Sequence, residues 1–430
     1  MISPMNSRVL LRGVATSIAE AMADTPVVVL NGARQVGKTT LARTLAVPGR
    51  VAMVSLDDAA ARQAASLDPR AFITRPVDTL VVDEAQLVPA LFRAIKAEVD
   101  RDRRPGRFLL TGSSRLLAAP DMADALVGRV ELIELWPFSQ GELAGTPETF
   151  IDRLFDHPGQ LLANGDISRA DLFARVLAGG FPDAVQRPAA RRRAWFASYV
   201  TTVCQRVVRQ LADIERLAEI PRLLKLCAAR TGTELNAANL ADAMAIPART
   251  ASAYLAHLAN AFLIQLVPAW STNLSAKVVR RPKLLLADSG LAAHLMGVTS
   301  TTLDGSSAAA GQLLETFVAM ELRKQIGWSL ARPSIWHFRD RSGVEVDLLL
   351  EHGDGRIVGI EVKATSSPKS ADFKGLRFLA ERLGDRFHFG CLLTAAPEAT
   401  PFGPKLAALP VSALWSAPQA MVRRARRQRR

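Results

Sequence analysis

The 430-residue sequence contains only three cysteines, Cys204, Cys227 and Cys391, and none of them belongs to a CxxC pair. Their number and spacing exclude a disulfide framework and a zinc ribbon, and they fit a reducing compartment. No segment reaches the ~18 uninterrupted apolar residues that a membrane helix needs. The N-terminus has no apolar core followed by a cleavage signal. We therefore expect a soluble, cytoplasmic protein with no membrane partner.

Histidine and tryptophan are scarce as well. The six histidines show no ligand spacing such as HxxxH, so a zinc site is not indicated. The tryptophans are too scattered to form a stacking platform for single strands.

Positive charge is abundant, because 54 Lys and Arg face 41 Asp and Glu, for a net charge of +13. This excess suits an anionic partner, with nucleic acid as the first candidate.

The length predicts about three domains at ~150 residues each, and the patterns predict an α/β multidomain protein. Short apolar runs alternate with helical stretches over residues 26–135, which is typical of a parallel sheet buried between helix layers. We expect strands at 27–30, 51–55, 80–82, 108–111 and 130–135. Helices are expected between them, at 38–46 and 89–99.

Helix periodicity dominates the middle of the chain. Residues 235–258 predict a short helix, a turn near Ile246-Pro247 and a second helix, and an apolar stretch at 261–267 could form a wing strand. This winged-helix-like unit could contact DNA through a polar face, or it could serve only for packing. The proposed face consists of Arg249, Thr250, Ser252, Tyr254 and His257.

A polar, small-residue stretch at 299–310 is typical of a linker. After it we expect an amphipathic helix at 311–325 and a small α/β domain with strands at 335–339, 344–351 and 357–362 and a helix at 373–382. The predicted domains are therefore 1–145, 146–310 and 311–415. Residues 416–430 hold six arginines and are expected to be a disordered, basic arm.

The most informative motif matches GxxxxGK[ST] and lies between the strand at 27–30 and the helix at 38–46. In this position the N–H groups of a curled loop and of a helix N-terminus can surround phosphates. Lys38 would reach the β and γ phosphates of ATP, and the Thr39 hydroxyl would ligate Mg²⁺. A Gly-rich turn with an exposed lysine is the alternative. The residues expected to bind the nucleotide are Gly32, Ala33, Arg34, Gln35, Val36, Gly37, Lys38, Thr39 and Thr40.

Two further strands end in polar residues. The strand at 80–82 is followed by Asp83, expected to hold Mg²⁺ through water, and Glu84, expected to polarise the attacking water. The alternative interpretation of this Asp-Glu pair is an acidic helix cap after the strand. Ser113 follows the next strand and is a candidate γ-phosphate sensor, with a Ser-rich turn as the alternative. Arg129 is a candidate arginine finger or sensor, and a structural salt bridge is its alternative.

In this order the motifs resemble the AAA-type ATP-binding domain at the front of a widespread prokaryotic family whose C-terminal half is a domain of unknown function. The similarity continues through residues 135–142, 179–182, the helix-turn-helix region, 283–290 and 315–322. It covers nearly the whole chain except the arginine-rich tail. The resemblance implies a P-loop NTPase fold that binds ATP and Mg²⁺, but no settled biological role.

The C-terminal domain resembles a restriction-endonuclease-like PD-(D/E)xK core. The period of two along a strand places Glu361 and Lys363 on one face. The resemblance implies that Asp347 and Glu361 share a divalent metal, that Lys363 is the catalytic ammonium, and that Glu315 supplies a further acidic group. A strand with one wet face also alternates charged and apolar residues.

Two functions remain open from the sequence. The first is a Mg²⁺-dependent ATPase whose nucleotide state controls a DNA-associated nuclease domain with its own divalent metal. The second is a nucleotide-switched module that binds DNA or protein through a catalytically inactive nuclease-like fold. The sequence leaves open the substrate, the choice among DNA, RNA and protein partners, and whether copies of the chain form a homo-oligomer.

Overall fold

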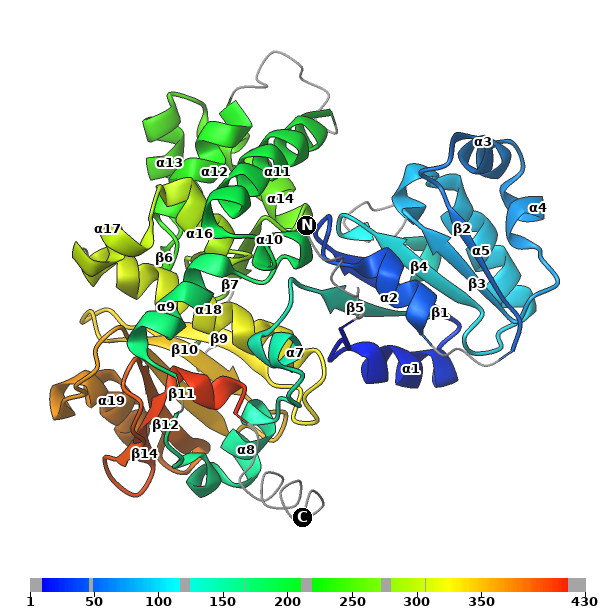
Figure 1. The fold of residues 1–430 in the computed structure, drawn as a ribbon. Helices are drawn as coiled ribbons and strands as arrows, with labels where there is room; N and C mark the ends of the chain where they lie inside the picture. The colour runs from blue at the N-terminus through cyan, green and yellow to red at the C-terminus, as the bar shows by residue number, and fades with distance from the viewer. Residues whose placement is uncertain are drawn as a thin grey trace, which may run out of the picture.

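The structure is a computed structural model that describes residues 10–45, 49–116, 124–165, 167–209, 219–271, 280–305 and 307–416. The chain forms two lobes (Figure 1). One holds the N-terminal part up to strand β5, and the other holds the rest. The predicted basic arm lies outside the described residues, apart from Ser416. Over the described ranges, every helix is too short or too polar to span a bilayer.

The N-terminal lobe is built on a parallel sheet with strand order β2-β3-β4-β1-β5. Each predicted strand is present, and two have the predicted bounds. The first strand extends to Gly32, where the phosphate-loop motif begins, and the third extends to Asp83. The strands are β1 (Val27–Gly32), β2 (Val51–Ser55), β3 (Thr79–Asp83), β4 (Phe108–Gly112) and β5 (Val130–Leu135).

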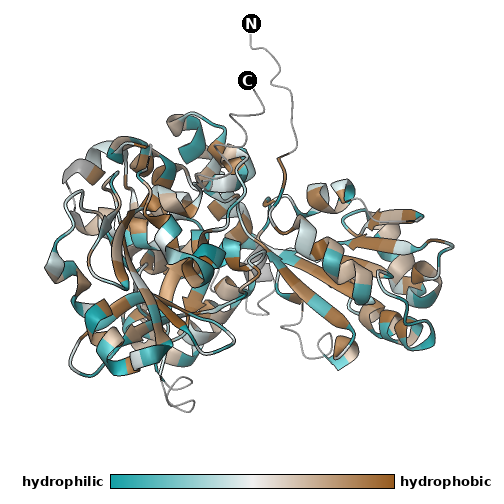
Figure 2. Ribbon diagram, turned by 90° about the horizontal axis from the view of Figure 1, so that it is seen from below, coloured by the Kyte–Doolittle hydropathy of each residue, from teal (hydrophilic) through white to brown (hydrophobic). Residues whose placement is uncertain are grey.

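Helices cover both faces of this sheet because its strands are apolar on both sides. Val28 and Leu30 of β1 pack on the side of α1 (Ala15–Asp24) and α2 (Lys38–Thr44). Val27 and Val29 belong to the opposite cluster, under α3 (Ala59–Leu67), α4 (Pro69–Ile73) and α5 (Ala90–Arg101). Figure 2 shows hydrophobic strands flanked by helices with hydrophilic outer positions.

The middle of the chain is mainly helical, as expected. Its three-stranded antiparallel sheet has the order β6-β8-β7, with β6 (Thr233–Glu234), β7 (Ile264–Val267) and β8 (Lys283–Leu286). The helices are α7 (Gln140–Ala144), α8 (Phe150–Asp156), α9 (Arg169–Ala178), α10 (Pro182–Val185), α11 (Ala189–Arg209), α12 (Glu219–Ala229), α13 (Ala237–Met244), α14 (Ala248–Asn260), α16 (Ser289–Met296) and α17 (Ser300–Gly305).

Two predictions for this region need correction. Tyr254 was placed on the polar face of the second helix, but its side chain is buried in the core with Leu255 and Leu258. The expected linker is also wrong: α17 and the start of α18 (Ser307–Ile326) occupy it. Alanine has the highest helix propensity, and the run at 308–310 extends α18, while Leu303 is buried.

The C-terminal part contains a six-stranded mixed sheet between two helices. Its strand order is β13-β14-β12-β11-β10-β9. Apolar residues of α18 pack on one face, and α19 (Lys374–Leu383) covers the other. The strands are β9 (Ser334–Arg339), β10 (Glu345–Glu351), β11 (Ile357–Lys363), β12 (Phe387–Thr394), β13 (Thr400–Pro401) and β14 (Leu406–Pro410). The helix α18 thus lies at the centre of the larger lobe.

Candidate functional site

The predicted phosphate loop joins the last residue of β1 to the first residue of α2. Gln35 and Gly37 both adopt positive φ angles, 62° and 96°, which curl the backbone. Gly32 is required by close packing, because a Cβ there would lie 2.2 Å from the carbonyl oxygen of Leu135 on β5. Thr40 faces solvent in the first turn of α2. The local sequence therefore produces the curl expected from the motif.

The ammonium group of Lys38 points into the curled loop. It donates hydrogen bonds to the carbonyl oxygens of Gly32 at 2.9 Å and Ala33 at 2.8 Å. Burial lowers the pKa of Lys38 to about 8, against the opposing charges of Glu84 and Asp83. Among the described residues the hydrogen bonds of this buried ammonium go to two carbonyls, so it is well placed to bind an anion.

Hydroxyl groups from three elements surround the carboxylate of Asp83 at the end of β3. Thr39 of α2 lies 3.1 Å from both carboxylate oxygens, and Thr111 of β4 donates to Oδ1 at 2.5 Å. Ser55 of β2 donates to Oδ2 at 3.3 Å. The parallel strands bring these side chains together because their carboxyl ends meet at one edge. Thr39 and Asp83 could hold a Mg²⁺ ion there.

Glu84 leaves β3 in a left-handed conformation with φ 57°, which turns its side chain towards β4. Its carboxylate accepts a hydrogen bond from the Ser113 hydroxyl at 2.7 Å and one from the Gln86 amide at 2.5 Å. The structure thus brings Lys38, Thr39, Asp83, Glu84 and Ser113 to one edge of the sheet.

Arg12 and Tyr199 also contact the loop, and sequence reasoning missed both. The guanidinium of Arg12 donates to the carbonyl oxygen of Val36 at 2.7 Å and pairs with Glu142 at 3.0 Å. The hydroxyl of Tyr199 on α11 donates to the carbonyl oxygen of Arg34 at 3.4 Å. No sequence signal could have revealed them, because neither belongs to a motif and the contacts cross 24 and 165 positions.

Arg129 lies at the wrong end of the sheet for a role in catalysis. It precedes β5, its carbonyl accepts a hydrogen bond from the first residue of β1, and its guanidinium pairs with Asp100 at 2.6 Å. The phosphate loop follows the other end of β1, and the strands are parallel. The interpretation of Arg129 as an arginine finger or sensor for its own chain is therefore wrong. It forms the structural salt bridge instead.

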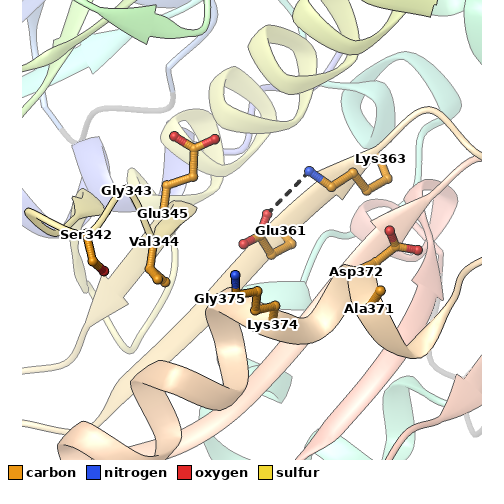
Figure 3. A pocket seen from close by; sticks show the side chains of 10 residues that line it. All are labelled: Ser342, Gly343, Val344, Glu345, Glu361, Lys363, Ala371, Asp372, Lys374 and Gly375. Atoms are coloured by element: carbon orange, nitrogen blue, oxygen red, sulfur yellow. Dashed lines mark ion pairs between the residues drawn. The ribbon is translucent and has the colours of Figure 1, made fainter.

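The C-terminal candidates come from two adjacent strands. Asp347 on β10 accepts a hydrogen bond from the backbone N–H of Val362 at 2.9 Å, beside Glu361 on β11. The register of β10 with β9 shifts between Val346 and Leu349, a stretch that contains Asp347, and local breaks of this kind are frequent next to active sites. Glu361 and Lys363 line a pocket of about 350 Å³, with 3.8 Å between their charged groups (Figure 3).

A lysine from the middle of the chain completes this cluster. The ammonium of Lys283 on β8 lies 2.6 Å from Glu315 Oε1 and 3.5 Å from Asp347 Oδ1. Burial lowers the pKa of Lys283, but the charges of Glu315 and Asp347 outweigh it and leave the pKa raised. No sequence motif connects Lys283 with these acids, which follow it by 32 and 64 positions.

The carboxyl groups of the cluster strongly influence each other. Burial and the negative charge of Asp347 raise the pKa of Glu361 well above its usual range, and a hydrogen bond with Asp347 adds to the effect. The same two causes, in the same order, raise the pKa of Glu315 to about 7. Among the described residues, no group of three or more His, Cys, Asp or Glu is arranged to hold a metal. A metal here would rely on Asp347 and Glu361.

Two mycobacterial proteins show where the chain belongs. It is 30% identical over 367 residues to the uncharacterized protein Rv2008c of Mycobacterium tuberculosis (strain ATCC 25618 / H37Rv), covering 83% of this chain and 74% of that protein. The uncharacterized protein Mb2031c of Mycobacterium bovis (strain ATCC BAA-935 / AF2122/97) gives the same values. The chain belongs to the family of these two proteins.

Three family models match successive parts of the chain. Residues 24–144 match the family described as "AAA domain", which coincides with the five-stranded sheet and the phosphate loop. Residues 169–302 and 310–414 match the domains of unknown function DUF8612 and DUF4143. The N-terminal lobe is thus an AAA-type P-loop ATPase domain, as the resemblance implied.

Solved structures resemble the chain only loosely. The Walker-type ATPase PABY2304 of Pyrococcus abyssi is 16% identical with a TM-score of 0.42, covering 67% of this chain and 99% of that one. The RuvB Holliday junction branch migration motor of Thermotoga maritima is also 16% identical, with a TM-score of 0.25, covering 59% and 89%. At these TM-scores neither similarity carries an argument about function.

Proposed function

We propose that the protein hydrolyses ATP at residues 32–40 and that its nucleotide state controls a DNA-associated, nuclease-like C-terminal domain. One observation carries the ATPase part of this proposal. The Thr39 hydroxyl lies 3.1 Å from both oxygens of Asp83, across the curled loop that holds the Lys38 ammonium. These are the groups that a Mg²⁺–triphosphate complex requires.

Each residue has a distinct task in this proposal. Phosphate oxygens replace the two loop carbonyls as acceptors for Lys38, and Arg34, whose buried Nε has no hydrogen-bond partner within the described ranges, can donate as well. Thr39 and, through water, Asp83 would hold Mg²⁺, which would supply positive charge against the phosphates. Glu84 orients the attacking water, and the Ser113 hydroxyl positions Glu84 and senses the γ-phosphate.

The nuclease-like assignment is supported by the order of elements. A helix with Glu315, a strand with Asp347 and an adjacent antiparallel strand with Glu361 and Lys363 follow one another. The antiparallel register places Asp347 opposite Glu361, and the N–H of Val362 donates to Asp347, so the two carboxylates are positioned to share one metal. In this proposal, a divalent ion would stabilise negative charge and Lys363 would orient water.

DNA association is proposed from the middle of the chain. The elements α12, β6, α13, α14, β7 and β8 follow in the order of a winged helix, with β6-β8-β7 as the small sheet. Arg249 and Ser252 are exposed on α14 and could meet phosphates or bases. Assembly into a homo-oligomer and a cytoplasmic location, which suits three free cysteines, remain part of the proposal.

A second candidate function is a nucleotide-switched binding module without cleavage. Two features favour it: the Lys283 ammonium already contacts Asp347 and Glu315, and burial together with the charge of Asp347 raises the pKa of Glu361, which favours its neutral form. An acidic site that is neutralised from within is a poorer metal site. This candidate predicts nucleotide-dependent DNA or protein binding with no cleavage product.

ATP hydrolysis tests the first half of the proposal. We expect Lys38→Ala to abolish nucleotide binding and Glu84→Gln to bind ATP but to hydrolyse it at least about a hundredfold more slowly. Ser113→Ala should lower kcat by about tenfold or more, because it removes a hydrogen bond to a charged group. Phosphate release and binding of a fluorescent ATP analogue measure these effects. Unchanged turnover in Lys38→Ala and Glu84→Gln would show that the site is misassigned.

The second half is tested with DNA. Cleavage of duplex and single-stranded DNA by the full chain, with ATP and Mg²⁺ or Mn²⁺, should be lost in Asp347→Asn and Lys363→Ala. The matched control is Lys369→Ala, an exposed lysine outside the pocket lining. Intact DNA with nucleotide-dependent binding would favour the second candidate.

A further inference from the structure

The Lys283 ammonium lies among oxygen atoms of the chemical kinds that also bind metal ions. It is within 3.5 Å of three oxygens, which are Glu315 Oε1, the carbonyl oxygen of Asp347 and Asp347 Oδ1, at 2.6, 3.2 and 3.5 Å. Carboxylate and backbone carbonyl oxygens are the ligands that hard divalent cations prefer. Lys283 is only 8% exposed, so water does not replace these contacts.

A second buried lysine, Lys324, has different hydrogen-bond partners and serves for comparison. Lys324 is a buried residue of α18. Its ammonium pairs with Glu321 at 2.6 Å and donates a hydrogen bond to the carbonyl oxygen of Phe138, which follows β5. Lys324 therefore pairs directly with one carboxylate of its own helix, and its charge also opposes the rise in pKa that burial causes at Asp288. Lys283 instead reaches from β8 to α18 and β10 and contacts two carboxylates from separate elements.

The acids of the cluster divide into two sides. Glu315 and one oxygen of Asp347 face Lys283, whereas Glu361 and Lys363 line the open pocket (Figure 3). The second oxygen of Asp347 is held by the N–H of Val362, between the two sides. A divalent ion could enter from the pocket at Glu361 and Asp347, but the place between Asp347 and Glu315 is filled.

We propose that Lys283 is the resident cation of the C-terminal acidic site and takes the place of one divalent ion. The site then binds at most a single divalent ion, between Asp347 and Glu361, and Lys283 is a positioning residue that fixes Asp347 for it. This inference rests on the proposed nuclease-like site, but it concerns cation binding and does not require DNA cleavage.

The origin of Lys283 gives the arrangement a second consequence. The lysine belongs to the three-stranded sheet of the middle region, whereas its partners belong to α18 and the six-stranded sheet. Glu315 and Asp347 are therefore paired with Lys283 only while β8 is docked against the C-terminal part. A shift of β8 would expose two unpaired buried carboxylates, which strongly favours uptake of a cation.

Counting bound Mn²⁺ tests the proposal. Free Mn²⁺ is titrated by electron paramagnetic resonance against the full-length, nucleotide-free wild type, Lys283→Met, Lys324→Met and the double variant Lys283→Met/Glu315→Gln. We expect Lys283→Met to bind one more Mn²⁺ per chain than the wild type. Lys324→Met, the matched loss of a buried lysine, should bind the wild-type number. The double variant should lose the extra ion, because Glu315 no longer carries a charge.

Equal Mn²⁺ counts in the wild type and Lys283→Met would overturn the proposal. If Lys283→Met is poorly folded, it is refolded with and without Mn²⁺ and its Tm is measured in both preparations. Mn²⁺ should raise this Tm by several degrees more than it raises the Tm of Lys324→Met. Equal Tm shifts in the two variants would overturn the proposal. A wild type that binds no Mn²⁺ at Asp347 and cuts no DNA would refute the nuclease-like function. An extra ion in Lys283→Met would still support the role of Lys283.

Discussion

Glu148 illustrates how burial changes the chemistry of a single residue. Its carboxyl group accepts hydrogen bonds from the Ser139 hydroxyl at 2.5 Å and the Gly141 N–H at 3.0 Å. Burial, and then the negative charge of Glu321 on α18, raise the pKa of Glu148 to about 8. The segment that leaves the ATPase domain is therefore joined to α18 through a carboxyl group that is protonated at neutral pH.

This raised pKa predicts a pH-dependent stability. A carboxyl whose pKa is higher in the folded than in the unfolded state stabilises the fold fully below the unfolded value, and this stabilisation is lost as the pH rises to the folded value. The window here runs from the usual 4.5 to about 8. We expect the free energy of unfolding to fall by up to about 1.4 kcal/mol per pH unit across it.

Urea unfolding of the wild type and Glu148→Gln across that window measures this effect. The substitution should reduce the slope by up to about 1.4 kcal/mol per pH unit, because glutamine has no proton to lose, and should leave the part of the slope that Glu315 and Glu361 contribute. Glu381→Gln, at an exposed position of α19, is the control and should keep the wild-type slope. Identical slopes for the wild type and Glu148→Gln would contradict the prediction.

At the scale of helices, two glycines have opposite roles. A Cβ at Gly311, inside α18, would meet no atom within 4 Å. A Cβ at Gly375, in the first turn of α19, would lie 2.2 Å from the carbonyl oxygen of Glu345 and 2.7 Å from Glu361 Oε1. Gly375 thus lets α19 approach β10 and β11 at the candidate site, whereas Gly311 only weakens its helix.

Alanine at these positions should therefore change stability in opposite directions. Gly311→Ala should raise the free energy of unfolding by about 0.5–1 kcal/mol, because glycine costs a helix that much relative to alanine. Gly375→Ala should lower it by about 1–3 kcal/mol, the usual cost of overpacking. Chemical denaturation of both variants tests this. A gain in stability for Gly375→Ala would show that α19 is not closely packed on the strands.

Across the whole molecule, Arg115 connects the ATPase domain to the middle region. It follows Ser113 by two residues, its N–H donates to the carbonyl oxygen of Asn260 at the end of α14, and its guanidinium donates to Gln265 on β7 at 3.2 Å. It also pairs with Glu134, which binds Arg323 of α18 at 2.7 Å. β7 pairs with β8, the strand that carries Lys283.

We expect Arg115→Ala to weaken the response of the middle region to nucleotide. In the Glu84→Gln background, ATP should change hydrogen exchange in α14, β7 and β8. Adding Arg115→Ala should reduce this change several-fold, because the direct side-chain contacts between the sensor loop and β7 are lost. The control is Arg129→Ala, which removes an ion pair at the opposite end of the sheet. An undiminished response in Arg115→Ala would refute this route.

Part of the candidate site could be predicted because its residues are consecutive. The motif from Gly32 to Thr39 and the pair Asp83-Glu84 each follow an apolar strand. Parallel strands bring their carboxyl ends to one edge of the sheet, whatever the helices between them contain. The error over Arg129 has the same origin. The sequence does not reveal at which end of the sheet an isolated arginine lies, and its partner Asp100 is 29 positions away.

The amino-acid sequence by itself determined the five strands of the N-terminal sheet, the strands β9 to β11, the phosphate loop and the acidic positions on β10 and β11, because these depend on local spacing and on the period of a strand or helix. It did not reveal β6, β8 or the strands β12 to β14. Tertiary structure alone decided that Arg12 binds the loop, that Tyr254 is buried and that Lys283 lies between Glu315 and Asp347. Such contacts join residues distant in sequence, and their energies depend on burial and charge pairing, which arise only when the chain has folded.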